Sequence, residues 1–237
     1  MSRTQKTDTG SRPQNPATKF LSWKSMEKSW AYWDKENETE VLIPHDEMAF
    51  IVLDQLNTVK GYDERARSGI WANEVRNLST DKLTIRNKDG IIQSGLYKDV
   101  KGSNGAKFTK SVYVMAKING EYELANLQLS GSSLGAWFEF ADEAGDLYGD
   151  VVVATKSTTE GKKGAVTYTM PCFSIITRSL STEASKQADE MDKKLQAYLK
   201  EYFSGGAATS GGTSEHDDDP IEDEPLDEAD EFGESPF

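Results

Sequence analysis

Short turn sequences recur between runs of apolar and β-branched residues, and this punctuation limits the possible folds more than any other feature of the chain. Asn119–Gly120 separates residues 108–118 from residues 121–129. Asn and Gly tolerate the positive φ angles that two-residue hairpin turns require. From Val112 to Ile118, every second residue forms one apolar face, which is the two-residue period of a strand. The pattern predicts a β-hairpin over residues 108–129.

The same pattern of two predicted strands joined by a short turn appears twice more. Lys88–Asp89–Gly90 lies between two further predicted strands, and Glu160–Gly164 lies between another pair. Pro171 in the last of these strands predicts an edge position or a bulge, because proline cannot donate to a sheet ladder. The predicted strands of these two hairpins are Lys82–Asn87, Ile91–Tyr97, Val151–Thr155 and Val166–Ile176. Upstream, Val41–Ile43 suits a strand, and the apolar run Met48–Leu53 suits either a buried strand or a buried helix.

Two segments are predicted to be helical. Ser133–Ala141 suits a short helix between strands, and Ser181 or Thr182 can cap a longer helix over residues 182–203. Apolar residues on the longer helix recur at spacings of three and four, which places them on one seam. This seam would pack on the body of the protein or form a contact between subunits of a homo-oligomer. Its residues are Ala184, Ala188, Met191, Leu195, Tyr198 and Tyr202.

These elements predict a mainly β protein. No alternation of strand and helix indicates a parallel sheet, so we expect antiparallel pairing. The leading candidate is an antiparallel Greek-key barrel like the oligonucleotide-binding (OB) fold, with an inserted short helix and a C-terminal helix; a β-sandwich is the alternative. We expect a flexible N-terminal arm over residues 1–18, a folded domain over 19–203 and a Gly/Ser linker over 204–214.

The charge of the chain is concentrated at one end. The net charge is −13, and residues 215–237 contain 12 acidic residues and no Lys or Arg. The remaining 28 acidic and 27 basic residues leave the rest of the chain almost neutral. Such an asymmetry indicates a disordered acidic tail with a function of its own.

The tail resembles those of bacterial and bacteriophage single-stranded DNA-binding proteins, which end in an acidic run closed by Pro-Phe or Phe. The matching acidic residues are Asp217, Asp218 and Asp219, and Pro236 and Phe237 match the end. Here Glu234 is separated from Pro236 by Ser235. The resemblance implies a protein that coats and protects single-stranded DNA in replication, recombination or repair. It also implies that the tail recruits a polymerase, helicase, primase or nuclease.

Sequence-tolerant binding of single strands needs cations for phosphates and aromatic faces for bases. Three interleaved groups supply both, although any one aromatic residue could equally belong to the core. Tyr113 and Lys117 lie opposite the apolar face of their strand, so we expect both to be exposed. The candidate DNA-binding residues are Trp23, Lys24, Trp30, Tyr32, Trp33, Lys60, Arg65, Arg67, Trp71, Arg76, Tyr97, Lys98, Lys101, Lys107, Lys110, Tyr113 and Lys117.

The sequence contains no complete catalytic motif. Gly131–Gly135 matches G-x-S-x-G, but the only later histidine that could complete a triad is His216, in the acidic tail. The two histidines and the lone Cys172 give no transition-metal ligand set, and we expect no cofactor. The single thiol and the absence of an apolar run of about 18 residues predict a cytoplasmic protein, in a bacterial host if phage-encoded, with no membrane partner. The alternative functions are an acidic inhibitor or DNA mimic and a phage structural or assembly protein.

Overall fold

The computed structural model describes residues 14–204 and is mainly β, as predicted. Its strands are β1 (Lys19–Lys24), β2 (Ser29–Asp34), β3 (Thr39–Pro44), β4 (Ala49–Asp63), β5 (Ser68–Ala72), β6 (Leu83–Asn87), β7 (Gly90–Gly95), β8 (Ala106–Ile118), β9 (Glu121–Leu129), β10 (Val152–Lys163) and β11 (Val166–Thr177). The helices are α1 (Tyr97–Val100), α2 (Gly131–Ala144) and α3 (Thr182–Ser204), with short 3-10 turns at His45–Glu47 and Ser103–Gly105.

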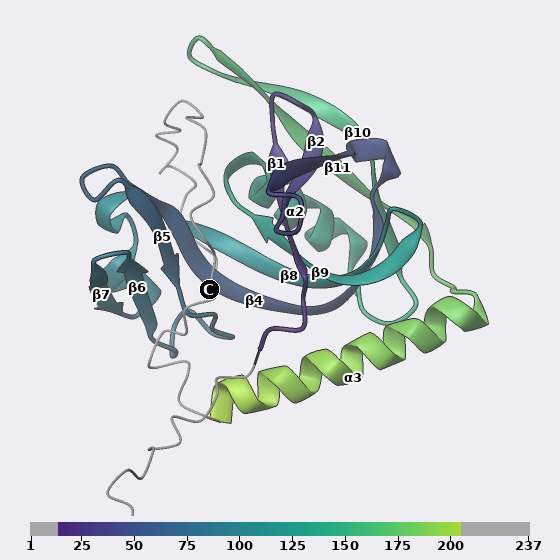
Figure 1. The fold of residues 1–237 in the computed structure, drawn as a ribbon. Coiled ribbons are helices and arrows are strands. Elements are labelled where there is room, and N and C mark those ends of the chain that lie inside the picture. The colour runs from purple at the N-terminus through teal and green to yellow at the C-terminus, as the bar shows by residue number, and fades with distance from the viewer. Residues whose placement is uncertain (1–13, 205–237) are drawn as a thin grey trace, which may run out of the picture.

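The strands form one twisted sheet around the long central strand β4 (Figure 1). The main path runs β3-β2-β1-β9-β8-β4-β5-β6-β7, and β10 pairs with both β4 and β11. The expectation of purely antiparallel pairing is wrong at one place, because β1 and β9 are parallel. All of β2–β8 lies between these two strands in the chain, so no local strand–helix–strand pattern marks the parallel pair.

The three predicted hairpins are confirmed, with two corrections to their bounds. Strand β10 continues to Lys163, so of the predicted turn Glu160–Gly164 only Gly164 lies outside the strand, and Tyr97, predicted to end a strand, begins α1. Asn119 and Gly120 have φ angles of 53° and 88°, and the turn sets Lys117 opposite Tyr122 in the β8–β9 ladder. Among the described strands, β11 pairs only with β10, so Pro171 lies in an edge strand as expected. The two helices are also confirmed, α2 being longer than predicted at both ends.

The main core lies between the inner face of the sheet and helix α2. Trp137 of α2 is 1% exposed, and its ring lies 5.0 Å from that of Phe173 and 6.2 Å from that of Phe50, measured between centroids. Strands β1, β2, β8, β9 and β10 add aliphatic and aromatic side chains to the same cluster. The aromatic cluster around Trp137 therefore joins α2 to β4 and β11.

Trp23, Trp30 and Tyr32 belong to this core and not to a binding surface. A turn at residues 25–28 divides the segment into β1 and β2, so Trp23 and Trp30 become register partners on the inner face. Their ring centroids are 5.4 Å apart, and the Trp30 side chain is fully buried. Both indole N–H groups are satisfied, by the Thr169 carbonyl and by the Thr155 hydroxyl. Their candidacy as stacking residues is thus contradicted by their burial.

A second, smaller core holds a lobe formed by β5, β6, β7 and α1. Its buried members include Val59 of β4, Ile70, Ile85 and Val100. Figure 1 shows this lobe at the far end of β4 from β1 and β2. Because β4 contributes to both cores, it joins the lobe to the rest of the sheet.

Helix α3 covers the opposite face of β4 and β8, which carries Leu56 and Tyr113 and which we call the outer face (Figure 1). The apolar seam of α3 packs there, with Leu195 and Leu199 buried, so it is occupied within the chain. Tyr113 is fully buried, and its predicted exposure is wrong because the strand has cover on both faces. In the described part of the chain, no helix is both long and apolar enough to cross a membrane.

Residues 14–18, which the sequence places in a flexible arm, lie against the cluster of α3 and the outer face. Asn15 donates to the Tyr113 hydroxyl at 3.0 Å, Ala17 is buried, and the Thr18 amide donates to the Leu124 carbonyl at 3.2 Å. The rest of the predicted arm, most of the linker and the acidic tail lie outside the described residues.

Candidate nucleic-acid interface

Four adjacent strands bring a row of cationic and aromatic residues together on the outer face. Lys60 of β4 is the register partner of Lys107 of β8 on one side and of Trp71 of β5 on the other. Trp71 is in turn the partner of Arg86 of β6. Residues directly opposite each other on paired strands project to the same face. We call Arg86, Trp71, Lys60 and Lys107 the cross-strand row.

The cross-strand row lies where the outer face is no longer covered by α3. Lys107 is exposed, and the other three members are half-buried. Tyr62, two residues beyond Lys60 on the same face, is 40% exposed. The Lys60 ammonium also lies 5.9 Å from the centre of the Phe20 ring, a cation–π distance. Aromatic rings and cations therefore lie next to each other on this surface.

The turn that follows β4 adds charge beside the row. Arg65 and Arg67 are both exposed in this turn, and the Asp63 carboxylate fixes its backbone by accepting from the amides of Arg65 and Ala66. These hydrogen bonds lower the pKa of Asp63. The two arginines thus project from a structured turn.

Other candidates lie on the opposite side of β8. Tyr97 packs edge-on against Phe108, which stacks on the half-exposed Phe138 of α2. Lys110 points to the same side and donates to the Asn57 side chain at 3.1 Å, and burial lowers its pKa. The sequence predicts one binding group from Tyr97, Lys98, Lys101, Lys107, Lys110 and Tyr113. The sheet divides this group, with Lys107 on one face and Tyr97 and Lys110 on the other. Lys98 and Lys101 are exposed in and just after α1, next to Tyr97 in the chain.

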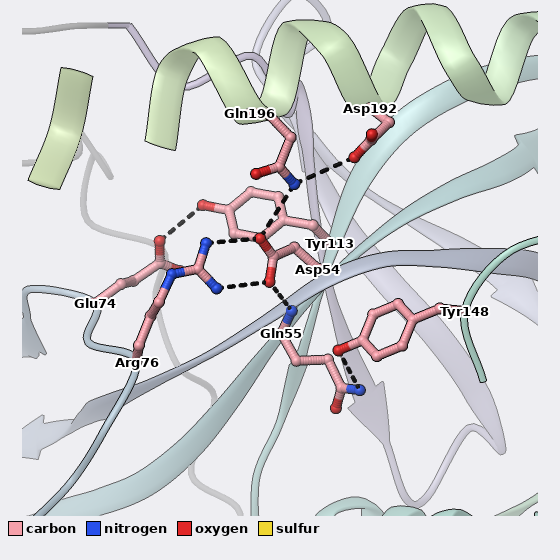
Figure 2. A network of polar contacts seen from close by, with 8 residues as sticks. All are labelled: Asp54, Gln55, Glu74, Arg76, Tyr113, Tyr148, Asp192 and Gln196. Atoms are coloured by element: carbon pink, nitrogen blue, oxygen red, sulfur yellow. Dashed lines mark hydrogen bonds and ion pairs between the residues drawn. The ribbon is translucent and has the colours of Figure 1, made fainter. Parts of the chain in front are cut away.

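Arg76 forms an ion pair with Asp54 within the folded domain. Figure 2 shows its guanidinium donating to both carboxylate oxygens of Asp54, at 3.1 and 2.9 Å. Gln196 of α3 donates to the same carboxylate at 3.2 Å, and the Arg76 guanidinium lies 5.4 Å from the centre of the Phe203 ring. The Asp54 hydrogen bonds raise the pKa of Arg76. This cluster ties the segment after β5 to β4 and α3.

Glu74 forms a second link in the same region. Its carboxylate accepts from the Ser111 hydroxyl and, at 2.7 Å, from the Tyr113 hydroxyl (Figure 2), while its backbone amide donates to Tyr202 of α3 at 2.8 Å. Burial raises the pKa of Glu74 and outweighs these hydrogen bonds and the nearby charge of Lys60, which lower it. Glu74 thus ionises at some cost to the folded state.

This raised pKa predicts a pH dependence of stability. Because folded Glu74 binds its proton more tightly than the unfolded residue, whose ordinary pKa is 4.5, the free energy of unfolding should fall as the pH rises through and above 4.5. Glu74→Gln should remove that decline, which denaturant titrations at several pH values would measure. Glu64→Gln, at an exposed position, is the matched control. An unchanged pH slope in Glu74→Gln would contradict the assignment.

The remaining candidates are scattered. Lys24 pairs with Glu40 at 2.8 Å, Trp33 is half-buried near the end of β2, and Lys117 is exposed at the far end of β8. The tail residues Asp217, Asp218, Asp219, Glu234, Pro236 and Phe237 lie outside the described residues. Sequence reasoning missed Arg86 and Phe20. The alternation of Thr84 and Arg86 with the apolar Leu83 and Ile85 was the available signal for Arg86.

The candidate interface is thus a strip of cations and aromatic rings on the outer face. Within residues 14–204, no cluster of three or more His, Cys, Asp or Glu side chains could hold a metal ion. Positive charge beside aromatic rings suits a single-stranded nucleic acid, whose phosphates contact the cations and whose bases stack on the rings. Comparisons with protein-family models, with curated proteins and with solved structures found no match to this chain.

Proposed function

We propose that this protein is a non-catalytic single-stranded DNA-binding protein that coats and protects exposed strands during replication, recombination or repair. The observation that carries the proposal is the cross-strand row, which sets an indole between cations on four adjacent strands. Stacking of a base on an aromatic side chain contributes about 1–3 kcal/mol and accepts any base. Cations that follow the phosphates add affinity that depends on salt.

We further propose that the fold is an elaborated OB fold. In that fold, five strands form a Greek-key barrel, and oligonucleotides bind to the face of strands two and three and to the loops after strands one and four. The succession β4, β8, β9, α2, β10 and β11 supports this assignment, because β4 pairs with both β8 and β10. The lobe of β5–β7 would then be an enlarged first loop, and the β10–β11 turn would be the fourth. The parallel strand β1 beside β9 is an addition to this plan.

This assignment makes sense of the distribution of charge. The lobe and the strand ends next to it carry Arg65, Arg67, Trp71, Arg86 and Lys107, where an OB fold would bind its ligand. A nearly neutral body can therefore still offer a locally cationic surface. An acidic inhibitor or DNA mimic would not need such a surface.

The proposed role of residues 215–237 is recruitment of a replication or recombination enzyme in the cytoplasm of the cell. Phe237 would fill an apolar pocket on a polymerase, helicase, primase or nuclease, and the acidic residues would steer it toward a basic surface. Deleting residues 215–237 is expected to leave affinity for single-stranded DNA unchanged or tighter while abolishing binding to the partner. Loss of DNA affinity in the truncated protein would contradict this division of labour.

Competition between strand types tests the proposal. Unlabelled single-stranded oligonucleotides should displace a labelled single strand from the protein, whereas a duplex of equal length should compete at least tenfold less well. The reason is that paired bases cannot stack on aromatic side chains. Equal competition by duplex DNA would indicate a binding mode that reads phosphates alone.

A further inference from the structure

Two side chains of the cross-strand row have hydrogen-bond donors without acceptors. Four buried side-chain polar atoms in residues 14–204 have no hydrogen-bond partner, and two of them are the Trp71 Nε1 and Arg86 Nε donors. Trp71 and Arg86 are register partners on β5 and β6, so the two donors belong to neighbouring side chains on one face. A buried donor without an acceptor is costly, and each case in a native fold calls for an explanation.

The neighbouring side chains of the row cannot satisfy these donors, because a lysine ammonium group donates hydrogen bonds and accepts none. Lys60 is the register partner of Trp71, and Lys107 is that of Lys60; both are cations. What this part of the row lacks is therefore an acceptor for the two donors, and a negatively charged one would also suit the Arg86 guanidinium and the exposed Lys107.

We propose that the cross-strand row holds a phosphate group of the bound strand, with the Trp71 indole N–H and the Arg86 guanidinium as its donors, and that the two half-buried side chains turn outward to present these buried donors when the strand binds. This inference rests on the proposed function. The planar guanidinium suits a phosphate because it can donate two parallel hydrogen bonds to two phosphate oxygens. Trp71 then donates through the edge of its ring, and the face of the ring remains available for stacking on a base. A base carbonyl, the alternative acceptor, is neutral and would complement the charge of the Arg86 guanidinium less well.

Trp71→Phe tests the donor separately from the aromatic face, since Phe keeps a ring and loses the N–H. We expect the full-length variant to bind oligo-dT about tenfold more weakly than the unsubstituted protein, the effect of one hydrogen bond to a charged group. The same tenfold loss should occur on an abasic strand, which has phosphates and no bases. On a methylphosphonate strand, which lacks the charged oxygens, the two proteins should bind equally. Tyr148→Phe, which removes a polar group from an exposed aromatic ring outside the cross-strand row, should bind all three strands normally.

Each other result overturns the inference. Equal binding of oligo-dT by Trp71→Phe and the unsubstituted protein would mean that the donor is unused or bound to water, while single-strand binding itself would stand. A loss seen on oligo-dT and absent on the abasic strand would assign the acceptor to a base. No binding of any strand by the unsubstituted protein would remove the proposed function together with this site. Arg86→Lys, which keeps the charge and loses the planar fork, gives an independent arm with the same expected tenfold loss.

Discussion

Replacing Trp137 by alanine is expected to lower the free energy of unfolding by about 3–5 kcal/mol, as is typical of large aromatic residues removed from a packed core. The Trp137 side chain is 1% exposed and lies among the rings of Phe50, Phe140 and Phe173. Its N–H also donates to the Gln55 side chain at 3.3 Å, so truncation leaves an acceptor without its partner. The midpoint of thermal unfolding should fall by roughly 6–20 °C.

The adjacent residue of α2 provides the control for this prediction. Phe138 is 48% exposed and stacks only on Phe108 among the ring contacts of the described chain. Phe138→Ala should therefore cost no more than about 1.5 kcal/mol, the upper range for one aromatic pair. Similar losses in the two variants would mean that α2 does not hold the core in the manner described.

Neutralising the lysines of the cross-strand row should have the largest effect on DNA binding. In Lys60→Ala/Lys107→Ala, two contacts to phosphate are lost, each worth about 1.5 kcal/mol, which corresponds to roughly 100-fold weaker binding at low salt. Log-log plots of affinity against salt concentration should become shallower by about 1.4, since each phosphate contact to a single strand contributes about 0.7. Fluorescence titrations across a salt series measure both quantities.

The control for this variant removes the same charge elsewhere. Lys186 and Lys194 are exposed on α3, away from the apolar seam of that helix. Lys186→Ala/Lys194→Ala should change affinity by less than threefold and leave the salt slope intact. An equal loss in both double variants would attribute binding to the net charge of the protein and not to the cross-strand row.

Local patterns predicted the elements of this fold better than their assembly. The Asn119–Gly120 turn and the alternation from Val112 to Ile118 specified β8, β9 and their register, because the information lies within a few residues. The apolar spacing of α3 likewise predicted a helix with one seam. The parallel contact of β1 with β9 depends on residues about a hundred positions apart, for which no local signal exists.

The candidate site was harder to predict, and a bulge in β4 is one reason. The register shifts between Val52 and Asp54, so side chains of the same parity point inward before the bulge and outward after it. Alternation counted from the apolar run at Met48–Leu53 would thus place Lys60 on the wrong face. The predicted exposure of Tyr113 was wrong for a different reason. Helix α3 covers the outer face through tertiary contacts, and strand periodicity carries no information about them.

The measurement that tests the central claim most directly is the fluorescence anisotropy of a labelled oligo-dT titrated with the full-length protein, with tryptophan emission followed across a salt series. The account predicts saturable binding, quenching of tryptophan emission and a linear loss of log affinity with log salt concentration. The quenching should disappear in Trp71→Phe, because Trp71 is the indole of the cross-strand row. Absence of binding by both the full-length protein and the form lacking residues 215–237 would contradict single-stranded DNA binding and favour an inhibitor or assembly role.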